Sequence, residues 1–324
     1  MDFYKFGETC DQILNVVGSI FVGNRILLRK ILCAALANGH VLFEDYPGLG
    51  KTLLAKIFAK VLGCKWARIQ FTPDLMPADI VGTRIWRVSS SEFVLEKGPI
   101  FTNILLADEI NRASPKTQSA LLEAMEERQV TIEGITHRLE YPFFVIATQN
   151  PIEMEGTYPL PEAQLDRFLV KLSTGYAETL ELECEILKRR IKWQRDDPTD
   201  FIEPVVSPEI FREMQKMMET DVYIDDQILE YIAKIVRNTR IHPMVEVGSS
   251  PRGGLSLLKL SRAHAAMCGR DFVTPDDVKM FARDALNHRI ILNVEHIVEG
   301  TSSALTVIDE ILSKIEAPKN FLRR

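Results

Sequence analysis

A glycine-rich loop that ends in a lysine and a threonine is the first segment of this sequence that could do chemistry. The loop, YPGLGKT at 46–52, lies between a predicted strand at 40–45 and a predicted amphipathic helix at 51–63. This is the order of a phosphate-binding loop, in which backbone N–H groups and the helix N-terminus favour anions. We expect Lys51 to reach the β- and γ-phosphates of a nucleotide and Thr52 to be a ligand of Mg²⁺. Asp45 stands where the pattern has its first glycine, and aspartate tolerates turn conformations.

Two further strand ends carry polar groups suited to nucleotide hydrolysis. Asp108 and Glu109 end an apolar run at 101–109, which is typical of a strand covered on both faces. We expect Asp108 to hold Mg²⁺ through water and Glu109 to polarise the attacking water as a general base. The alternative is an acidic pair that only marks the end of a strand. Asn150 ends another predicted strand, where it is either a turn residue or an amide that orients the same water; beside the other motifs we favour the second.

Two arginines complete the candidate site. Arg167 precedes a short predicted strand, and an arginine finger supplied by a neighbouring subunit contributes roughly 10³–10⁵ in rate to nucleotide hydrolysis. Its alternative is a surface salt bridge with Asp166. Arg252 lies in the first turn of a predicted helix in the second half of the chain. That position suits a residue that reports the nucleotide state, and an ordinary solvated arginine is the alternative.

Alternating strands and helices must position these residues. Short apolar runs and helical patterns alternate over the first part of the chain, which predicts an α/β fold, a mostly parallel sheet with helices on both faces. The predicted strands are 40–45, 65–71, 101–109, 141–150 and 166–172, and Ser114-Pro115 begins a helix that extends to Arg128. Two segments, 88–100 and 129–141, interrupt the alternation and are interpreted as β-hairpin insertions.

The pattern becomes all-helical after Gly175. Residues 177–195 form a long amphipathic helix, with Leu180, Cys184, Leu187 and Ile191 on one face, and 196–200 is a short linker. Helix starts follow at Ser207-Pro208, Asp225, Ser250-Pro251 and Thr274-Pro275. We therefore divide the chain into a nucleotide-binding domain at 1–195, which includes the connecting helix, and a small helical domain at 196–324.

Composition limits the classes of protein this chain can belong to. Of its 324 residues 46% are apolar, so it can bury a substantial core, and its net charge of −6 disfavours nucleic acid as a partner. No apolar run approaches the ~20 residues that a membrane-spanning helix needs, and the first ten residues do not resemble a signal peptide. The five cysteines are scattered and never spaced as CxxC, which favours reduced thiols and no transition-metal site. These features favour the cytoplasm.

The motifs, in this order, resemble the AAA+ ATPases, and nearly the whole chain is similar to their MoxR family. The matching stretches are GHVLFEDYPGLGKTLLAK, IQFTPDLMPADIVG, GPIFTNILLADEINRASPKTQSALLEAMEERQVTIEG, FFVIATQNPIEMEGTYPLPEAQLDRF and GRDFVTPDDV. The resemblance implies a P-loop AAA+ core with β-hairpin insertions and a helical lid. It also implies an ATP-driven ring, usually a hexamer, that remodels protein clients in a chaperone-like way. Such proteins often work with a von Willebrand factor A domain protein, inserting metals or maturing complexes.

The resemblance also assigns roles to single residues. Glu109 belongs to Walker B, Asn150 is sensor 1, Arg167 is the arginine finger and Arg252 is sensor 2. Val22-Gly23 lies where such proteins contact adenine, although a plain helix-to-turn junction is the alternative. The expected contacts of ATP and Mg²⁺ are Val22, Gly23, Pro47, Gly48, Leu49, Gly50, Lys51, Thr52, Leu53 and Asp108.

Three functions compete on this sequence. The leading one is a homo-oligomeric ATPase that turns hydrolysis into force on a protein client, with Arg167 of one subunit acting at the site of the next. A nucleotide-gated adaptor with negligible hydrolysis is disfavoured because Glu109, Asn150 and Arg167 are all present. A nucleic-acid motor is disfavoured by the acidic pI of about 5.7.

Overall fold

A five-stranded parallel sheet forms the centre of the computed structural model, which describes residues 1–89, 91–151, 156–295 and 303–319. The strand order is β2-β5-β8-β1-β9, and every neighbouring pair is parallel. The strands are β1 (Val41–Glu44), β2 (Trp66–Gln70), β5 (Ile104–Asp108), β8 (Phe144–Gln149) and β9 (Val170–Leu172). The five predicted strands and the α/β fold class are therefore confirmed, with each strand slightly shorter than its apolar run.

Helices cover both faces of the sheet, and alternate strand residues enter two different apolar clusters. Val41 and Phe43 face the cluster that contains α1 (Phe3–Ile20), α2 (Arg25–Leu36) and α3 (Lys51–Val61). Leu42, between them, faces the cluster formed with α4 (Pro77–Val81) and α5 (Pro115–Glu127). This alternation is what the two-residue period of a strand buried on both faces requires. Two short elements, η1 (Ile110–Arg112) and α6 (Glu162–Leu165), follow β5 and precede β9.

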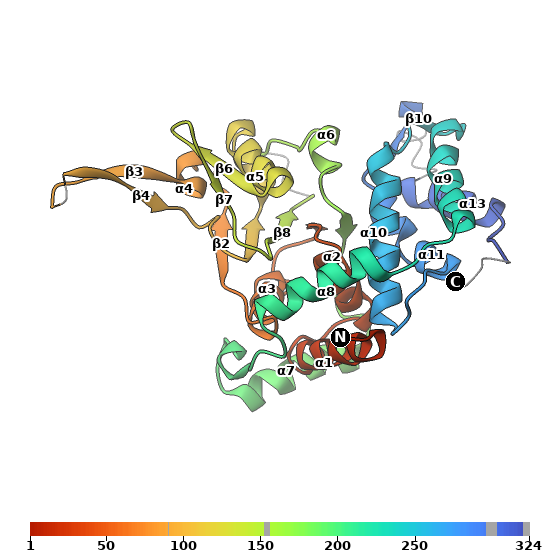
Figure 1. The fold of residues 1–324 in the computed structure, drawn as a ribbon, viewed down its shortest axis with the longest axis horizontal. Helices are drawn as coiled ribbons and strands as arrows, with labels where there is room; N and C mark the ends of the chain where they lie inside the picture. Colours follow the sequence, from red (N-terminus) through yellow and green to blue (C-terminus); the bar gives the residue numbers. More distant parts are fainter. Residues whose placement is uncertain (90, 152–155, 296–302, 320–324) are drawn as a thin grey trace.

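Two β-hairpins are inserted in the α/β core; the first projects from it, whereas the second lies beside α5 (Figure 1). The second hairpin, β6 (Gln129–Ile132) with β7 (Ile135–Arg138), lies where the sequence predicted it. The first was predicted at 88–100, and that placement was wrong. Its strands are β3 (Gly82–Arg87) and β4 (Glu92–Lys97), so the predicted segment contains the second strand but not the first. Pairing starts at Gly82, where a Cβ atom would lie 2.2 Å from the carbonyl oxygen of Glu96.

The described residues of the second half of the chain are mostly helical. The helices are α7 (Leu180–Trp193), η2 (Thr199–Phe201), α8 (Pro208–Asp221), α9 (Asp226–Ile241), α10 (Pro251–Met267), α11 (Pro275–Leu286) and α13 (Ala304–Lys314). Ser207, Asp225, Ser250 and Thr274 are N-caps, as predicted. The expectation of an all-helical segment was wrong, because β10 (Val245–Val247) pairs with β11 (Ile291–Leu292). Strands of three and two residues are too short to produce a recognisable alternation.

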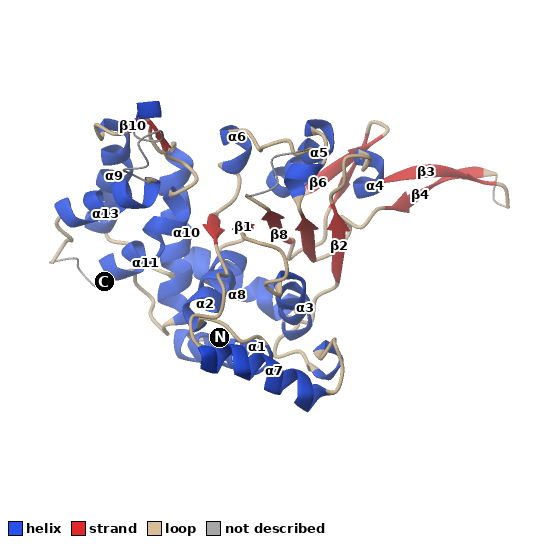
Figure 2. Cartoon of the chain, turned by 180° about the vertical axis from the view of Figure 1, so that it is seen from behind, coloured by secondary structure: helices blue, strands red, loops and turns tan. Residues whose placement is uncertain are grey.

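One apolar cluster joins the two halves. It runs from α1, α2 and α3 across β1 and β9 into α8, α9, α10, α11 and α13 (Figure 2). Helix α7 differs, since the predicted apolar face is largely in solvent; Leu180 and Ile191 are 75% and 73% exposed. The division of the chain at residue 196 stays a prediction. In the described part of the chain, no helix has the length and apolarity needed to cross a membrane.

Candidate functional site

The glycine-rich loop joins β1 to α3 and wraps around the Lys51 side chain. Gly48 and Gly50 have φ values of +84° and +76°, which place them in the left-handed region that favours glycine. Helix α3 begins at Lys51, directly after Gly50, so its first N–H groups face the loop. The Lys51 Nζ donates hydrogen bonds to the carbonyl oxygens of Tyr46 at 2.9 Å and Asp45 at 3.3 Å. Burial lowers the pKa of Lys51, and the carboxylates of Asp45, Asp108 and Glu109 oppose that shift.

Asp45 has a different role from the one its turn propensity suggested. It lies outside the left-handed region, and its carboxylate is buried. Oδ1 accepts a hydrogen bond from Ser173 Oγ at 2.6 Å, and Oδ2 accepts one from the Thr174 N–H at 2.7 Å. An aspartate can therefore replace the first glycine of the loop, since its side chain binds the loop to the segment after β9.

The phosphate side of the site is a hollow of about 440 Å³ above the carboxyl ends of the strands. Among the predicted residues that line it are Lys51, Thr52, Asp108, Glu109 and Asn150. They come from α3, from β5 and its following residue, and from the residue after β8. Parallel strands meet their neighbours with all carboxyl ends at one edge, so residues far apart in sequence converge there.

Asp108 is held in place by two residues that the sequence analysis did not identify. Thr148 Oγ1 donates to its Oδ1 at 2.7 Å, and Arg68 Nη2 donates to its Oδ2 at the same distance. Arg68 lies on β2, which pairs with β5, and it also lines the hollow. A search for cations near the end of the strand neighbouring β5 would have found it, but only once the strand order was known.

Glu109 is also engaged by residues that the sequence did not single out. Its Oε2 accepts hydrogen bonds from Gln70 Nε2 at 2.7 Å and from Arg112 Nη1 at 3.0 Å. Its backbone has a φ of +56°, which is uncommon for a residue with a side chain and clusters at functional sites. Both hydrogen bonds are to Oε2, so neither of them occupies Oε1.

The donor groups in the hollow fit Mg²⁺. The Thr52 hydroxyl and the Asp108 carboxylate line the same space, and hard oxygen ligands completed by phosphate oxygens are what Mg²⁺ prefers. Thr148 fixes one Asp108 oxygen by donating to it.

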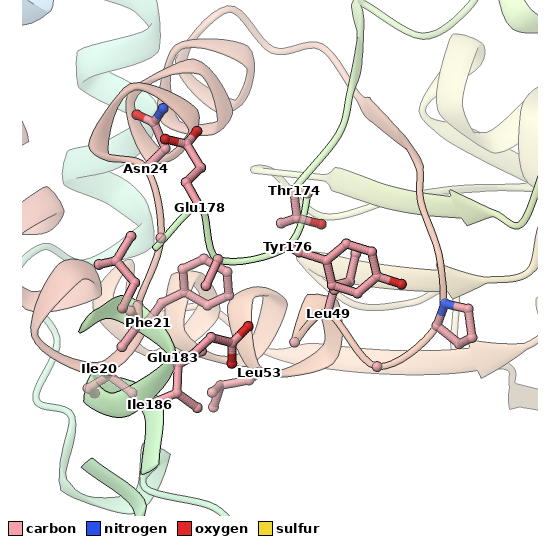
Figure 3. A pocket seen from close by; sticks show the side chains of 18 of the residues that line it. Ile20, Phe21, Asn24, Leu49, Leu53, Thr174, Tyr176, Glu178, Glu183 and Ile186 are labelled. Carbon is pink, nitrogen blue, oxygen red and sulfur yellow. The ribbon is translucent and has the colours of Figure 1, made fainter. Parts of the chain in front are cut away.

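A second cavity, of about 530 Å³, adjoins the phosphate hollow and shares the glycine-rich loop with it. Figure 3 shows Phe21, Leu53 and Ile186 together with the Tyr176 ring and Leu49 around this space. Val22 and Gly23 also line it, as the predicted adenine contact requires. An apolar cavity beside a phosphate site suits a planar base, and Asn24 and Glu178 supply polar groups at its edge.

Arg167 and Arg252 do not join this assembly in the described chain, since neither lines either cavity. They lie together instead, and both pair with Glu126 near the end of α5. The alternative that paired Arg167 with Asp166 is not what forms. Asp166 binds the buried Arg289 at 2.6 Å and accepts a hydrogen bond from Ser250 Oγ at 2.8 Å.

Comparison with known proteins agrees with this geometry. The family model described as "ATPase family associated with various cellular activities (AAA)" matches residues 40–170, and the model described as "AAA lid domain" matches residues 237–311. Chaperone MoxR1 of Mycobacterium tuberculosis is 40% identical over 96% of this chain and 83% of its own length. The chain is a member of the MoxR family of AAA+ ATPases.

Other relatives of this MoxR-family ATPase cover the same length. An uncharacterized protein of Bacillus subtilis named YeaC is 49% identical over 93% of this chain and 92% of its own. The crystal structure of a candidate ATPase from Cytophaga hutchinsonii superposes with a TM-score of 0.90 at 39% identity, covering 98% of this chain and 97% of that one. The AAA+ fold with its lid is therefore confirmed, and the protein is a nucleotide-binding ATP hydrolase. The roles given to single residues stay predictions.

Proposed function

We propose that this MoxR-family ATPase works as a ring, in which Arg167 and Arg252 of one subunit act on ATP bound to the next. The observation that carries the proposal is the separation of the predicted site into two groups. Lys51, Asp108 and Glu109 line the phosphate hollow, whereas the two arginines lie together on Glu126, outside it. A neighbour that docks these arginines against the hollow completes the site.

Within one subunit the division of labour follows from the contacts. Lys51 and the loop N–H groups bind and orient the β- and γ-phosphates, and the second cavity takes the base. Thr52 and Asp108 hold Mg²⁺, which supplies charge neutralisation at the phosphates when bound. Glu109 accepts a proton from the attacking water, and Asn150 orients that water.

The work of the ring is proposed to be done on a protein client. A relative 40% identical is named a chaperone, which supports a chaperone-like role for this chain. A hexamer, a von Willebrand factor A domain partner, and metal insertion or complex maturation follow from the family resemblance and are part of the same proposal. We place the enzyme in the cytoplasm, where ATP is abundant, with residues 1–195 as the nucleotide-binding domain and 196–324 as the lid.

The test is the ATPase rate per subunit as a function of protein concentration, with Mg²⁺. We expect the rate to rise with concentration to a plateau, and Arg167→Ala to lower the plateau by a factor of about 10³ or more while ATP binding is retained. Arg237→Ala is a matched control, because Arg237 is an exposed arginine on α9. A rate independent of concentration, unchanged by Arg167→Ala, would overturn the proposal.

A further inference from the structure

Glu126 is the point at which the two distant arginines meet. One carboxylate oxygen, Oε2, lies 2.7 Å from Arg167 Nη1, and the other, Oε1, accepts a hydrogen bond from Arg252 Nη2. The Arg167 side chain is 31% exposed and that of Arg252 is 45% exposed, so both reach the surface. Two guanidinium groups this close repel each other unless an anion lies between them, and Glu126 is that anion.

A second carboxylate fixes the backbone beside each arginine. Asp166 directly precedes Arg167, and its Oδ2 accepts from the hydroxyl of Ser250, two residues before Arg252. Ser250 is the N-cap of α10, and its Oγ accepts from the Arg252 N–H at 3.1 Å. The chain segments that carry the two arginines are therefore tied together by Asp166. Glu126 adds a contact that both side chains share, and this contact directs the two guanidinium groups to one point.

The contacts with Glu126 leave the Nη2 group of Arg167 and the Nε and Nη1 groups of Arg252 outside the ion pairs. A guanidinium has five N–H groups. The bonds of Arg167 to Glu126 and to the Leu122 carbonyl, at 3.1 Å, both use Nη1, and the bond of Arg252 uses Nη2. Arg167 Nε is buried, so it is not open to an incoming anion, and Nη2 is the group of this side chain that remains for one. Each arginine can thus stay on Glu126 while other N–H groups bind an anion.

We propose that Glu126 is a positioning residue, which holds Arg167 and Arg252 as one preformed unit for the γ-phosphate of the neighbouring subunit's ATP. Free arginine side chains carry about 2 kcal/mol of rotamer entropy each, and a bridging carboxylate removes that cost before the ring closes. The proposal rests on the function proposed above, since it needs the arginines to act between subunits.

The first test is the steady-state kinetics of Glu126→Gln, which keeps the size of the side chain and removes its charge. We expect kcat to fall by about 10- to 100-fold, with KM for ATP changed less than about 3-fold because the nucleotide cavities of that subunit are untouched. Glu126→Asp should recover part of the rate. Glu213→Gln is the control, an exposed glutamate on α8 outside the hollow that Glu126 and Arg167 line, and its kinetics should equal those of the wild type. A kcat for Glu126→Gln that equals or exceeds the wild-type value would overturn the inference.

Mixing two impaired variants then locates the defect. Lys51→Ala subunits lack a working nucleotide site but keep their arginines, so mixing them with Glu126→Gln subunits should restore activity above either variant alone. Arg167→Ala mixed with Lys51→Ala is run in parallel. If only the Arg167 mixture recovers, Glu126 acts within its own subunit and the inference fails, whereas the proposed function stands. If the Arg167 mixture does not recover, action between subunits fails, and the inference fails with it.

Discussion

The buried ion pair between Asp166 and Arg289 offers a sharp test of how the two halves of the molecule are joined. Arg289 follows α11, and its side chain is only 2% exposed. Nε donates to Asp166 Oδ1 at 2.6 Å, and Nη2 donates to the carbonyl oxygens of Phe168 at 2.6 Å and Asp166 at 2.9 Å. Burial lowers the pKa of Arg289, and Asp166 is the charge that opposes this shift.

Asp166→Asn removes that charge and keeps the shape. Removing one partner of a buried ion pair costs about 3–5 kcal/mol, because an uncompensated charge is left in a medium of low polarity. The asparagine oxygen can still accept from Arg289 Nε, and the carbonyl acceptors remain. We therefore expect a loss near the lower end, about 3 kcal/mol in the free energy of unfolding.

Urea unfolding followed by circular dichroism measures this loss. Glu126→Gln is a useful reference, since it neutralises another carboxylate that pairs with arginine but is 33% exposed, and surface pairs contribute about 1 kcal/mol or less. A loss for Asp166→Asn as small as that of Glu126→Gln would refute the reasoning, because burial would then make no difference.

Two further predictions concern the C-terminal end of α10. The hydrogen bond from His264 lowers the pKa of the exposed Cys268, whereas burial raises the pKa of Cys64 to about 12. Because the thiolate is the reactive form, iodoacetamide at pH 7 should alkylate Cys268 far faster than Cys64. Peptide mass spectrometry measures the two rates. Equal rates would contradict this. Although burial alone would lower the pKa of His264, its hydrogen bond to Asp277 and the neighbouring Cys268 raise it to about 9. Because this folded-state pKa exceeds the unfolded value of about 6.5, the stabilisation is complete below pH 6.5 and is lost as pH rises through about 9. Urea unfolding should therefore show a free energy of unfolding that is lower at pH 9.5 than at pH 6 by at most about 3 kcal/mol, and His264→Gln should abolish this difference. The same difference in the variant would exclude His264 as its source.

The sequence was most informative about features that are formed entirely by residues close together in the chain. The loop at Lys51 needs left-handed glycines, a preceding strand and a following helix, and all are neighbours in sequence. The same holds for the helix starts, because an N-cap such as Ser250 bonds to a backbone N–H two residues away. These features are local, so residue type and spacing suffice to predict them.

The features that escaped prediction depend on contacts between distant segments. Arg68 meets Asp108 only because β2 lies beside β5 in the sheet, 40 residues away in the chain. Glu126 meets Arg252 across 126 residues, where the start of α10 comes within hydrogen-bond distance of the end of α5. A single sequence gives the identity of these residues, but their neighbours are decided by tertiary packing.

The apolar cluster that runs from α1 to α13 has a mechanical consequence. Since a closely packed core resists deformation, we expect the sheet and the second-half helices to move together. A structural change at the phosphate hollow would then rotate one subunit relative to its neighbour rather than deform the subunit internally. The β3–β4 hairpin, which projects from the α/β core in Figure 1, becomes a lever arm of about 20 Å for strands of six residues. Turning such an arm by about 10° displaces its tip by about 3 Å, close to the ~3.3 Å rise of one residue in an extended polypeptide.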